Sequence, residues 1–339
     1  MLNEKHRRRI AQRIAEAVGG GQEDRGQEEL VEVVPCSGGC DNDAFVARRA
    51  GCPTKFFLKV NEKGKEEALS KFEAEAMALR DISATNTIRV PEPLVTDTLR
   101  EDGGGGAFFV MEYLAFTSTD RGTDKMFGEQ LAALHLASPP SQHSSSFGYA
   151  VDNWCGADKQ FNTPWSIEDW PQFYSQYRLE PQRRRIQERY KDNEIVSLIE
   201  QLQEALPTFF CGLREPIKPS LLHGDLWSGN WAAVMVDNDG TSAEKQAVIF
   251  DPAAYYGHHE CELGIMSMFG GPSTEFYKAY HALIPKEEGF DDRQDLYQLY
   301  HYLNHYSIFG RGYRGTCLNI LRKLLEISYR AGNCRNHRA

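Results

Sequence analysis

The sequence of 339 residues predicts an α+β protein with a mainly β first lobe over residues 1–114 and a mainly helical second lobe over residues 115–339. Two observations support this division. Short apolar runs bounded by Gly- and Pro-containing turns, which are typical of strands, gather before Leu114. Longer amphipathic stretches, which are typical of helices, dominate after it. We expect the functional site in the cleft between the two lobes.

The first lobe begins with a predicted helix over residues 4–18, where Ile10, Ile14 and Val18 recur at helical spacing before a run of glycines. A second, longer helix over residues 65–82 consists of strong helix formers. Strands are predicted on both sides of the second helix, namely a pair around a Gly-containing turn in residues 30–50, the run 54–60, and a hairpin of residues 92–101 and 106–114.

The second lobe alternates predicted helices with one irregular stretch and one pair of strands. The irregular stretch, residues 138–165, contains Ser, Pro and Trp and lacks periodicity. The strands, residues 230–240 and 245–251, are two short apolar runs around a turn. Helices are predicted over residues 125–138, 166–190 and 194–210, and again within residues 272–330.

The charge of the chain limits its partners. The formal net charge is -10 and the pI is about 5.5. General binding to nucleic acid or to a membrane surface needs a basic field, so we expect neither. A small phosphorylated ligand needs only a few local cations and is compatible with this charge. Because no run of 18 or more apolar residues occurs, no transmembrane helix is expected.

The cysteines and the N-terminal sequence favour a cytoplasmic protein. The eight cysteines are scattered without paired CxxC motifs, which favours reduced thiols over a structural zinc site. The first 21 residues carry charge throughout and lack the apolar core of a secretory signal. The early arginines leave organelle import as an alternative, against which Glu4 and Glu16 argue.

Four sequence features that suit phosphoryl transfer occur in order along the chain. The first is the turn "CSGGCD" at residues 36–41, and the second is Lys59, which lies in an apolar run and is followed sixteen residues later by Glu75. The third is "HGDLWSGN" at residues 223–230, and the fourth is Asp251 at the end of "AVIFD".

The chemistry of phosphoryl transfer explains why these residue types belong together. Backbone amides of a Gly-rich turn cover phosphates, and a lysine oriented by a helical glutamate pairs with them. One aspartate accepts the proton of the attacking hydroxyl, while an asparagine and a second aspartate hold Mg²⁺. The spacing H-x-D-x4-N of the kinase catalytic loop is present, with Asp225 and Asn230 in the two key positions.

Each feature also has a plainer interpretation. The loop could be a polar turn, and a lysine in a strand usually faces solvent. Glu73 competes with Glu75 for Lys59, but the apolar neighbours Ala76 and Leu79 place Glu75 on the buried side of the helix. The correct order of all four features favours the catalytic interpretation.

Two histidines raise a separate question. His301 and His305 lie one helical turn apart, as a metal-binding pair would. No carboxylate follows at a suitable spacing, so we expect a role in the polar core or in the substrate pocket instead.

Longer motifs resemble the fructosamine-3-kinase (ketosamine-3-kinase) family. They are "FVMEYL", "LLHGDLWSGNW", "FDPAAYYGHHECELGIMSMFGG" and "YQLYHYLNHYSIFGRGY", and the resemblance covers nearly the whole chain. The tryptophan inside the catalytic loop distinguishes this family from the aminoglycoside and choline kinases. The resemblance implies a two-lobed, protein-kinase-like fold of the aminoglycoside phosphotransferase type.

The resemblance also implies an activity. Such enzymes use ATP with Mg²⁺ (or Mn²⁺) to phosphorylate the C3 hydroxyl of ketosamines, such as fructosamines and ribulosamines, either as small molecules or on glycated protein lysines. The phosphorylated adduct then decomposes and releases the free amine, which makes the reaction a deglycating repair. Two alternatives are a kinase for an aminoglycoside-like or choline-like alcohol, and a non-catalytic, redox-sensitive scaffold.

Carried over to this sequence, the family pattern assigns a role to each matching residue. Asp225 is expected to be the catalytic base, and Asn230 and Asp251 the metal ligands. Trp227 and His305 are expected in the sugar pocket, although a satisfied core histidine remains the alternative for His305. The residues expected to bind ATP are Gly38, Gly39, Cys40, Lys59, Glu75, Met111, Glu112, Tyr113 and Leu114.

The phosphate turn departs from the family pattern. Ser37 stands where relatives carry a glycine, and Asp41 would repel phosphates if its carboxylate faced them. Cys40 occupies the position of the family's phosphate-loop cysteine, which can link two chains, so we expect a monomer or a redox-linked homodimer. Cys36 is an additional thiol that could form an intrachain bond with Cys40 instead.

Overall fold

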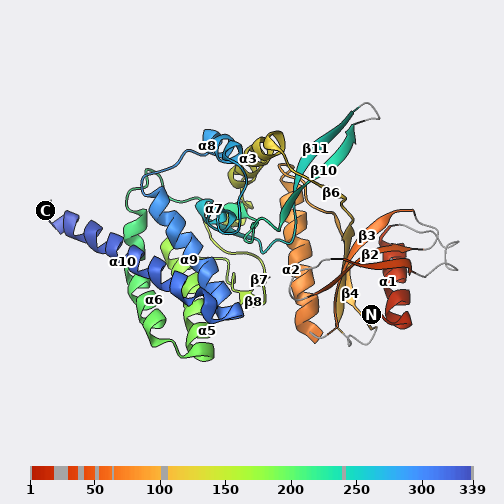
Figure 1. Ribbon diagram of the computed structural model, residues 1–339, viewed down its shortest axis with the longest axis horizontal. Coiled ribbons are helices and arrows are strands. Elements are labelled where there is room, and N and C mark those ends of the chain that lie inside the picture. The colour runs from red at the N-terminus through yellow and green to blue at the C-terminus, as the bar shows by residue number, and fades with distance from the viewer. Residues whose placement is uncertain are drawn as a thin grey trace. The chain divides into compact units, whose positions relative to one another are not determined.

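The computed structural model describes residues 2–18, 30–36, 42–49, 53–62, 65–100, 106–238 and 242–336. The chain folds into two compact units, traced in Figure 1. The first unit comprises Met1–Thr119 together with Ala232–Asp251, and the second comprises Asp120–Trp231 together with Pro252–Ala339. The expected α+β class is confirmed, because a five-stranded sheet forms the centre of the first unit and helices form most of the second.

The sheet of the first unit has the strand order β1-β2-β3-β5-β4, and each neighbouring pair is antiparallel. Its strands and two helices match the elements predicted for residues 4–114. They are α1 (Glu4–Ala17), β1 (Leu30–Cys36), β2 (Asp43–Arg49), β3 (Lys55–Asn61), α2 (Lys65–Ala84), β4 (Pro93–Thr98) and β5 (Ala107–Glu112).

The alternation of side chains along β3 decides which face each residue takes. Phe56, Leu58 and Val60 enter a core cluster that includes Ile10 and Ile14 of α1. Lys59 therefore points to the opposite face of the sheet. There α2 packs on β4 and β5, as the contact between Phe72 of α2 and Phe109, the β5 partner of Lys59, shows.

A second sheet, of order β11-β10-β6, completes the first unit. β10 (Trp231–Asn238) and β11 (Ser242–Ile249) are the two strands predicted around a turn. β6 (Phe116–Thr117) was not predicted, because two residues show no periodicity. Its pairing with Ala233 and Val234 of β10 brings Ala232–Asp251 into the first unit.

Helices of the second unit largely follow the predicted ranges. Asp169 caps the first turn of α4 by accepting from the Gln172 amide, so residues 166–169 precede the helix rather than belonging to it. The elements are α3 (Arg121–Leu136), α4 (Trp170–Tyr174), a π-helix (Ser175–Leu179), α5 (Glu180–Tyr190), α6 (Asn193–Ala205), α7 (Glu260–Met266), α8 (Thr274–Leu283), α9 (Phe290–Phe309) and α10 (Arg314–Asn336), with 3-10 turns at Ser141–His143, Leu206–Phe210 and Arg311–Tyr313.

Four short strands lie among these helices. The region predicted to be irregular contains a hairpin of β7 (Asn153–Cys155) and β8 (Asp158–Gln160), so the prediction was wrong there. Three-residue strands are too short for alternation to reveal them. β9 (Ser220–Leu222) and β12 (Tyr255–Gly257) pair antiparallel on either side of the predicted catalytic loop.

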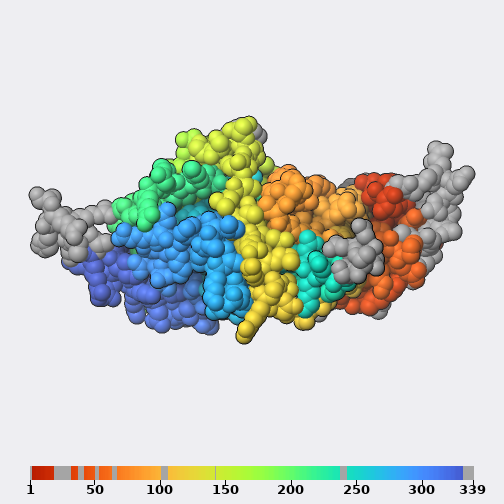
Figure 2. All heavy atoms as spheres, turned by 90° about the horizontal axis from the view of Figure 1, so that it is seen from above, coloured from red at the N-terminus to blue at the C-terminus, as the bar shows by residue number. Residues whose placement is uncertain are grey.

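Helices α3 and α8 pack closely and lie side by side at the surface, where Figure 2 shows them in yellow and blue. A Cβ at Gly128 of α3 would lie 2.3 Å from the Phe276 carbonyl oxygen, so this glycine permits the close approach. Within the described residues, every helix is too short or too polar to span a membrane.

Candidate active site

Lys59 lies at the centre of a buried ion-pair cluster in the first unit. Its ammonium donates to Glu75 Oε1 over 2.7 Å and to Asp251 Oδ1 over 2.6 Å. The three residues come from β3, from α2 and from the segment just after β11. Glu75 rather than Glu73 faces the lysine, since Glu73 is exposed to solvent. The predicted pairing of Lys59 with Glu75 is therefore present, and this strand lysine does not face solvent.

The charges of this cluster do not balance when all three groups are ionised. One ammonium then faces two carboxylates, which leaves one net negative charge beside the buried Lys59. Burial alone would lower the pKa of Lys59, but the attraction of Asp251 and Glu75 outweighs burial and raises it. Burial raises the pKa of Glu75 to about 7, against the opposing attraction of Lys59. A cation or a proton would relieve the excess negative charge.

Asp251 has an unusual backbone conformation. Its φ of 58° lies in the left-handed region, which few residues other than glycine adopt. Such outliers gather at functional sites, where neighbouring contacts hold them in place. The bond to Lys59 is one such contact.

The segment of residues 111–114, expected to bind ATP, spans the end of β5 and the two residues after it. Met111 is buried in the sheet, and the Glu112 amide donates to the Glu92 carbonyl over 2.9 Å. The Glu112 carboxylate pairs with Arg89 over 2.6 Å. Tyr113 and Leu114 follow the strand, and Tyr113 is exposed.

In the second unit, the loop of residues 223–230 is held by buried contacts at its start. Gly224 has a φ of 83°, and a Cβ there would lie 2.2 Å from the Ala253 carbonyl oxygen, so only glycine fits. The Glu262 carboxylate of α7 accepts from the amides of His223 and Gly224. The Ala253 amide donates to the His223 carbonyl over 2.8 Å. The backbone just before Asp225 is therefore held rigidly.

Asn230 closes the same loop. Its side-chain Nδ2 donates to the Asp225 carbonyl over 2.8 Å, and its amide donates to the Trp227 carbonyl over 2.9 Å. Asn230 is buried and Asp225 is half-buried. Because Nδ2 donates this bond, the orientation of the side-chain amide is fixed, and its oxygen is the side-chain atom that can bind a metal.

An exposed aromatic surface adjoins this loop and joins the two residues predicted for the sugar pocket. Trp227 and Phe269 are each 40% exposed, with ring centroids 6.3 Å apart. The Phe269 ring also lies 5.2 Å from that of His305. Burial lowers the pKa of His305, which keeps its imidazole neutral at neutral pH. Ser228 fixes the segment by donating to the Phe269 carbonyl over 2.9 Å.

Phe269 is a candidate that sequence reasoning did not single out. An aromatic residue before a glycine pair was the available signal, but Phe269 lies after α7, far from both Trp227 and His305 in the sequence. Its position between their rings follows only from the packing of α7 and α9.

The remaining predicted residues lie in the phosphate turn. Cys36 ends β1 as a free, half-buried thiol, and burial raises its pKa. Gly38, Gly39, Cys40, Ser37 and Asp41 lie outside the described residues.

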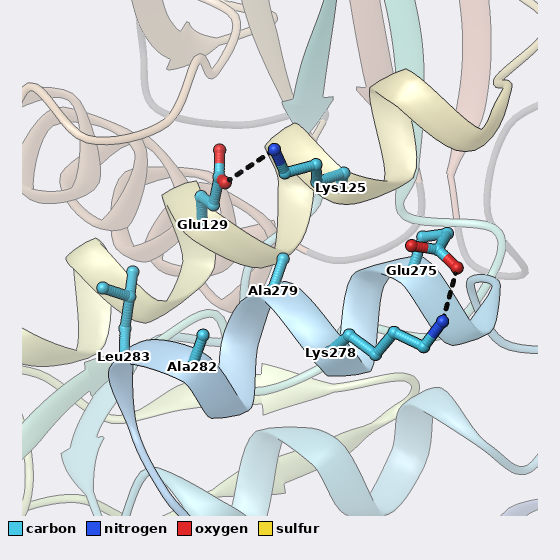
Figure 3. Close-up of a pocket in the computed structure, with 7 residues that line it drawn as sticks. All are labelled: Lys125, Glu129, Glu275, Lys278, Ala279, Ala282 and Leu283. Carbon is cyan, nitrogen blue, oxygen red and sulfur yellow. Dashed lines mark hydrogen bonds and ion pairs between the residues drawn. The ribbon is translucent and has the colours of Figure 1, made fainter.

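A surface hollow of about 480 Å³ lies between α3 and α8 (Figure 3). Lys125 pairs with Glu129 over 3.6 Å and Lys278 with Glu275 over 2.8 Å, each within its own helix. The other lining residues are Ala279, Ala282 and Leu283. None of the predicted site residues lines this hollow.

Comparison with known proteins identifies relatives along almost the whole chain. The family model described as fructosamine kinase matches residues 10–327. Protein-ribulosamine 3-kinase, chloroplastic, from Oryza sativa subsp. indica is 40% identical over 300 residues, covering 88% of this chain and 80% of that protein. Ketosamine-3-kinase from Mus musculus is 41% identical over 291 residues, covering 80% of this chain and 88% of that protein.

Solved structures show the same fold. A candidate fructosamine-3-kinase from Haemophilus somnus 129PT has a TM-score of 0.76 and 26% identity, covering 93% of this chain and 96% of that one. A mutant of aminoglycoside phosphotransferase APH(4)-Ia has a TM-score of 0.56 and 13% identity, covering 91% and 97%. The second likeness concerns the fold alone, and it confirms the predicted aminoglycoside phosphotransferase type.

Proposed function

Because the chain belongs to the fructosamine kinase family, it is a kinase of ketosamines, and we propose that it transfers a phosphoryl group from ATP to the C3 hydroxyl of a sugar carried on an amine. The observation that carries the proposal is the buried Lys59, bonded to both Glu75 and Asp251. Phosphoryl transfer uses such a lysine, oriented by a helical glutamate, to pair with the α- and β-phosphates.

Asp225 is the proposed catalytic base. It would accept the proton of the C3 hydroxyl as the oxygen attacks the γ-phosphorus. The bonds of Glu262 and Ala253 to residues 223 and 224 fix the start of its loop, and Asn230 bonds to the Asp225 carbonyl. These bonds fix the backbone from which the Asp225 carboxylate extends.

We propose Asn230 and Asp251 as the ligands of Mg²⁺ (or Mn²⁺), because each side chain carries oxygen atoms. Asp251 offers carboxylate oxygens, and Asn230 offers the side-chain oxygen left by its bond to Asp225. Hard cations of this kind prefer oxygen ligands. The excess negative charge beside Lys59 also favours a cation. When bound, the metal would neutralise charge on the phosphates.

For ATP, we propose that Tyr113 and Leu114 supply the backbone contacts to adenine. The Glu112 amide is already bonded to Glu92, and Met111 is buried within the sheet. Gly38, Gly39 and Cys40 remain proposed phosphate contacts on the strength of the sequence alone.

The sugar is proposed to lie on the surface formed by Trp227, Phe269 and His305. Aromatic faces suit the apolar C–H side of a sugar ring, and a neutral imidazole can hydrogen-bond a hydroxyl. Fructosamines and ribulosamines are the substrate class, free or on protein lysines. Decomposition of the product would release the amine, which makes the reaction a deglycation.

We also propose that Cys40, rather than Cys36, is the thiol that responds to oxidants and links two chains. The thiolate is the reactive form, and burial raises the pKa of Cys36 and so reduces its thiolate fraction. Intact mass without reductant, after mild oxidation of Cys36→Ser and Cys40→Ser, tests this: a disulfide-linked dimer should persist in the first variant only.

The central proposal is tested by measuring ADP release with Mg²⁺–ATP and four acceptors: a ribulosamine, a fructosamine, kanamycin and choline. Turnover is expected with the two ketosamines alone. Asp225→Asn should lower kcat by about 10²–10⁴-fold while ATP affinity stays within about twofold. If this variant kept its turnover, another group would have to be the base.

A further inference from the structure

Three side chains with metal-binding atoms lie close together, and one of them is the proposed base, Asp225. The Cys155 thiol, an Asp225 carboxylate oxygen and a His301 ring nitrogen all lie within 4.8 Å of one another. Cys155 and His301 are buried and Asp225 is half-buried. The three residues come from β7, from the loop after β9 and from α9, all in the second unit.

Hydrogen bonds fix the position of Cys155 relative to His301. Asn304 Nδ2 donates to the Cys155 carbonyl over 3.1 Å, and the Tyr300 hydroxyl donates to Gln160 Oε1 over 3.0 Å. Both donors belong to α9, the helix that carries His301, and both acceptors belong to the β7–β8 hairpin. The hairpin and the helix therefore hold their two side chains at a set distance.

The same hairpin is tied to the loop that carries Asp225. Gln160 Nε2 donates to the Ala253 carbonyl over 2.9 Å, and the Ala253 amide donates to the His223 carbonyl over 2.8 Å. The elements that carry the three ligands are thus hydrogen-bonded to one another, mostly through side chains. Preorganisation of this kind is what a metal site requires of its protein.

Besides the geometry of the cluster, an unpaired nitrogen of His301 independently indicates a bound ion. This atom, Nδ1, is buried and has no hydrogen-bond partner among the described residues. Buried polar atoms are nearly always paired, so an orphan calls for an explanation such as an ion. Burial, with smaller effects of His305 and Arg178, lowers the pKa of His301 to about 3, so the imidazole is neutral and keeps a lone pair.

We propose that Cys155, Asp225 and His301 bind one soft divalent cation, of which Zn²⁺ is the model, and that this cation inhibits the kinase by occupying the Asp225 carboxylate. Sulfur, nitrogen and oxygen ligands in one set are typical of Zn²⁺. Bond lengths of about 2.0–2.3 Å imply ligand atoms about 3.4–3.6 Å apart around a tetrahedral ion. The present separations of up to 4.8 Å require shifts of only about 1 Å.

Mg²⁺ would not compete for this site, because it prefers octahedral oxygen ligands and binds thiolate poorly. On binding Zn²⁺, the Cys155 thiol releases its proton to solvent, and the fourth position stays open to water or to an acceptor hydroxyl. The inhibitory half of the proposal rests on the proposed role of Asp225. The binding half does not.

Direct metal binding is the first test. The full-length chain, freed of metal with a chelator and kept reduced, is titrated with Zn²⁺ against a chromophoric chelator. Cys155→Ser should weaken the tightest site at least tenfold, and His301→Asn should do the same. Cys211→Ser, which changes an exposed thiol outside the cluster, is the matched control and should leave the affinity unchanged. Equal affinity in wild type and Cys155→Ser would overturn the proposal.

Co²⁺ gives a readout that needs no variant of the buried cluster to fold. Binding to the wild-type protein should produce the thiolate-to-cobalt charge-transfer absorption of a site with one sulfur ligand. The band should persist in Cys211→Ser and disappear in Cys155→Ser, with thermal unfolding confirming that both are folded. Absence of the band in the wild-type protein would contradict a cysteine ligand.

Inhibition is measured separately, at saturating Mg²⁺–ATP. For each protein, the measured quantity is the Zn²⁺ concentration that halves its own uninhibited rate. This concentration should be equal for wild type and Cys211→Ser, and at least tenfold higher for Cys155→Ser. Asp225→Asn distinguishes the two proposals. If this variant kept its turnover but bound Zn²⁺ more weakly, Asp225 would be a metal ligand and not the catalytic base. If it lost turnover but bound Zn²⁺ as tightly as wild type, Asp225 would be the base and not a metal ligand.

Discussion

Lys59 donates a hydrogen bond of 2.6 Å to Asp251, which lies 192 positions later in the chain. The same ammonium bonds Glu75, so one side chain orients both the helix glutamate and the proposed metal ligand. A charged hydrogen bond of this kind contributes about 1.5–3 kcal/mol. Loss of either carboxylate should therefore change the position of Lys59 and, with it, the binding of ATP.

A pair of glutamates on α2 gives a matched test of this arrangement. Glu75→Gln should lower kcat/KM for ATP by about 10–100-fold, because the amide orients Lys59 less strongly. Glu73→Gln makes the same change on the exposed side of the helix, and its kcat/KM for ATP should stay within about twofold of the wild-type value. Steady-state kinetics with varied ATP measure both. Equal effects of the two substitutions would contradict the specific role of Glu75.

Stability should depend on pH through Glu75. Its folded-state pKa of about 7 lies above the ordinary value of 4.5, so the folded state binds the proton more tightly. This contribution to the free energy of unfolding is fully present below pH 4.5 and is lost as the pH rises through about 7.

The measurement is urea unfolding across that pH range. The difference in the free energy of unfolding between wild type and Glu75→Gln should change over this pH range, since glutamine does not titrate. The wild-type curve should fall relative to that of the variant as the pH rises. A difference that stays constant would mean that Glu75 titrates normally in the folded protein.

Phe269 should affect the acceptor and not the nucleotide. Phe269→Ala removes the ring between Trp227 and His305 and should raise KM for the ketosamine about 5–30-fold, from a loss of about 1–2 kcal/mol. KM for ATP should stay within about twofold. Tyr329→Ala, which removes an exposed ring from α10, is the control. A larger change in KM for ATP than for the ketosamine would mean that Phe269 affects nucleotide binding rather than the acceptor.

Gly224 should tolerate no side chain. Gly224→Ala places a Cβ 2.2 Å from the Ala253 carbonyl oxygen at a φ of 83°, and should lower the free energy of unfolding by about 2–4 kcal/mol. Gly312→Ala is the control, because nothing lies within 4 Å of its Cβ. Denaturant unfolding of both variants decides the matter. A Gly224→Ala protein as stable as the control would contradict the close approach seen here.

The sequence was informative where spacing reflects a local rule. Sixteen residues separate Lys59 from Glu75, and the apolar neighbours of Glu75 were enough to choose it over Glu73, as the ion pair confirms. The same reasoning located nearly all elements longer than five residues. It could not show that Lys59 is buried, because that depends on which face of the sheet α2 covers.

Contacts between distant segments were not predictable in this way. β6 and the β7–β8 hairpin have two or three residues per strand, too few to show a period. Phe269 reaches His305, and Cys155 reaches His301, only through the packing of separate elements on α9. The metal-pair interpretation of His301 and His305 lacked a carboxylate, and Asp225 provides one beside His301 from another part of the chain.

The segment Ala232–Asp251 has a consequence for how this enzyme can be rearranged in evolution or in the laboratory. It folds with the first unit, although residues of the second unit precede and follow it in the chain. A single genetic crossover near residue 119 would therefore exchange only part of the first unit and would separate Lys59 from its inherited partner Asp251. Functional chimaeras between relatives need two further junctions, one on each side of the β10–β11 hairpin.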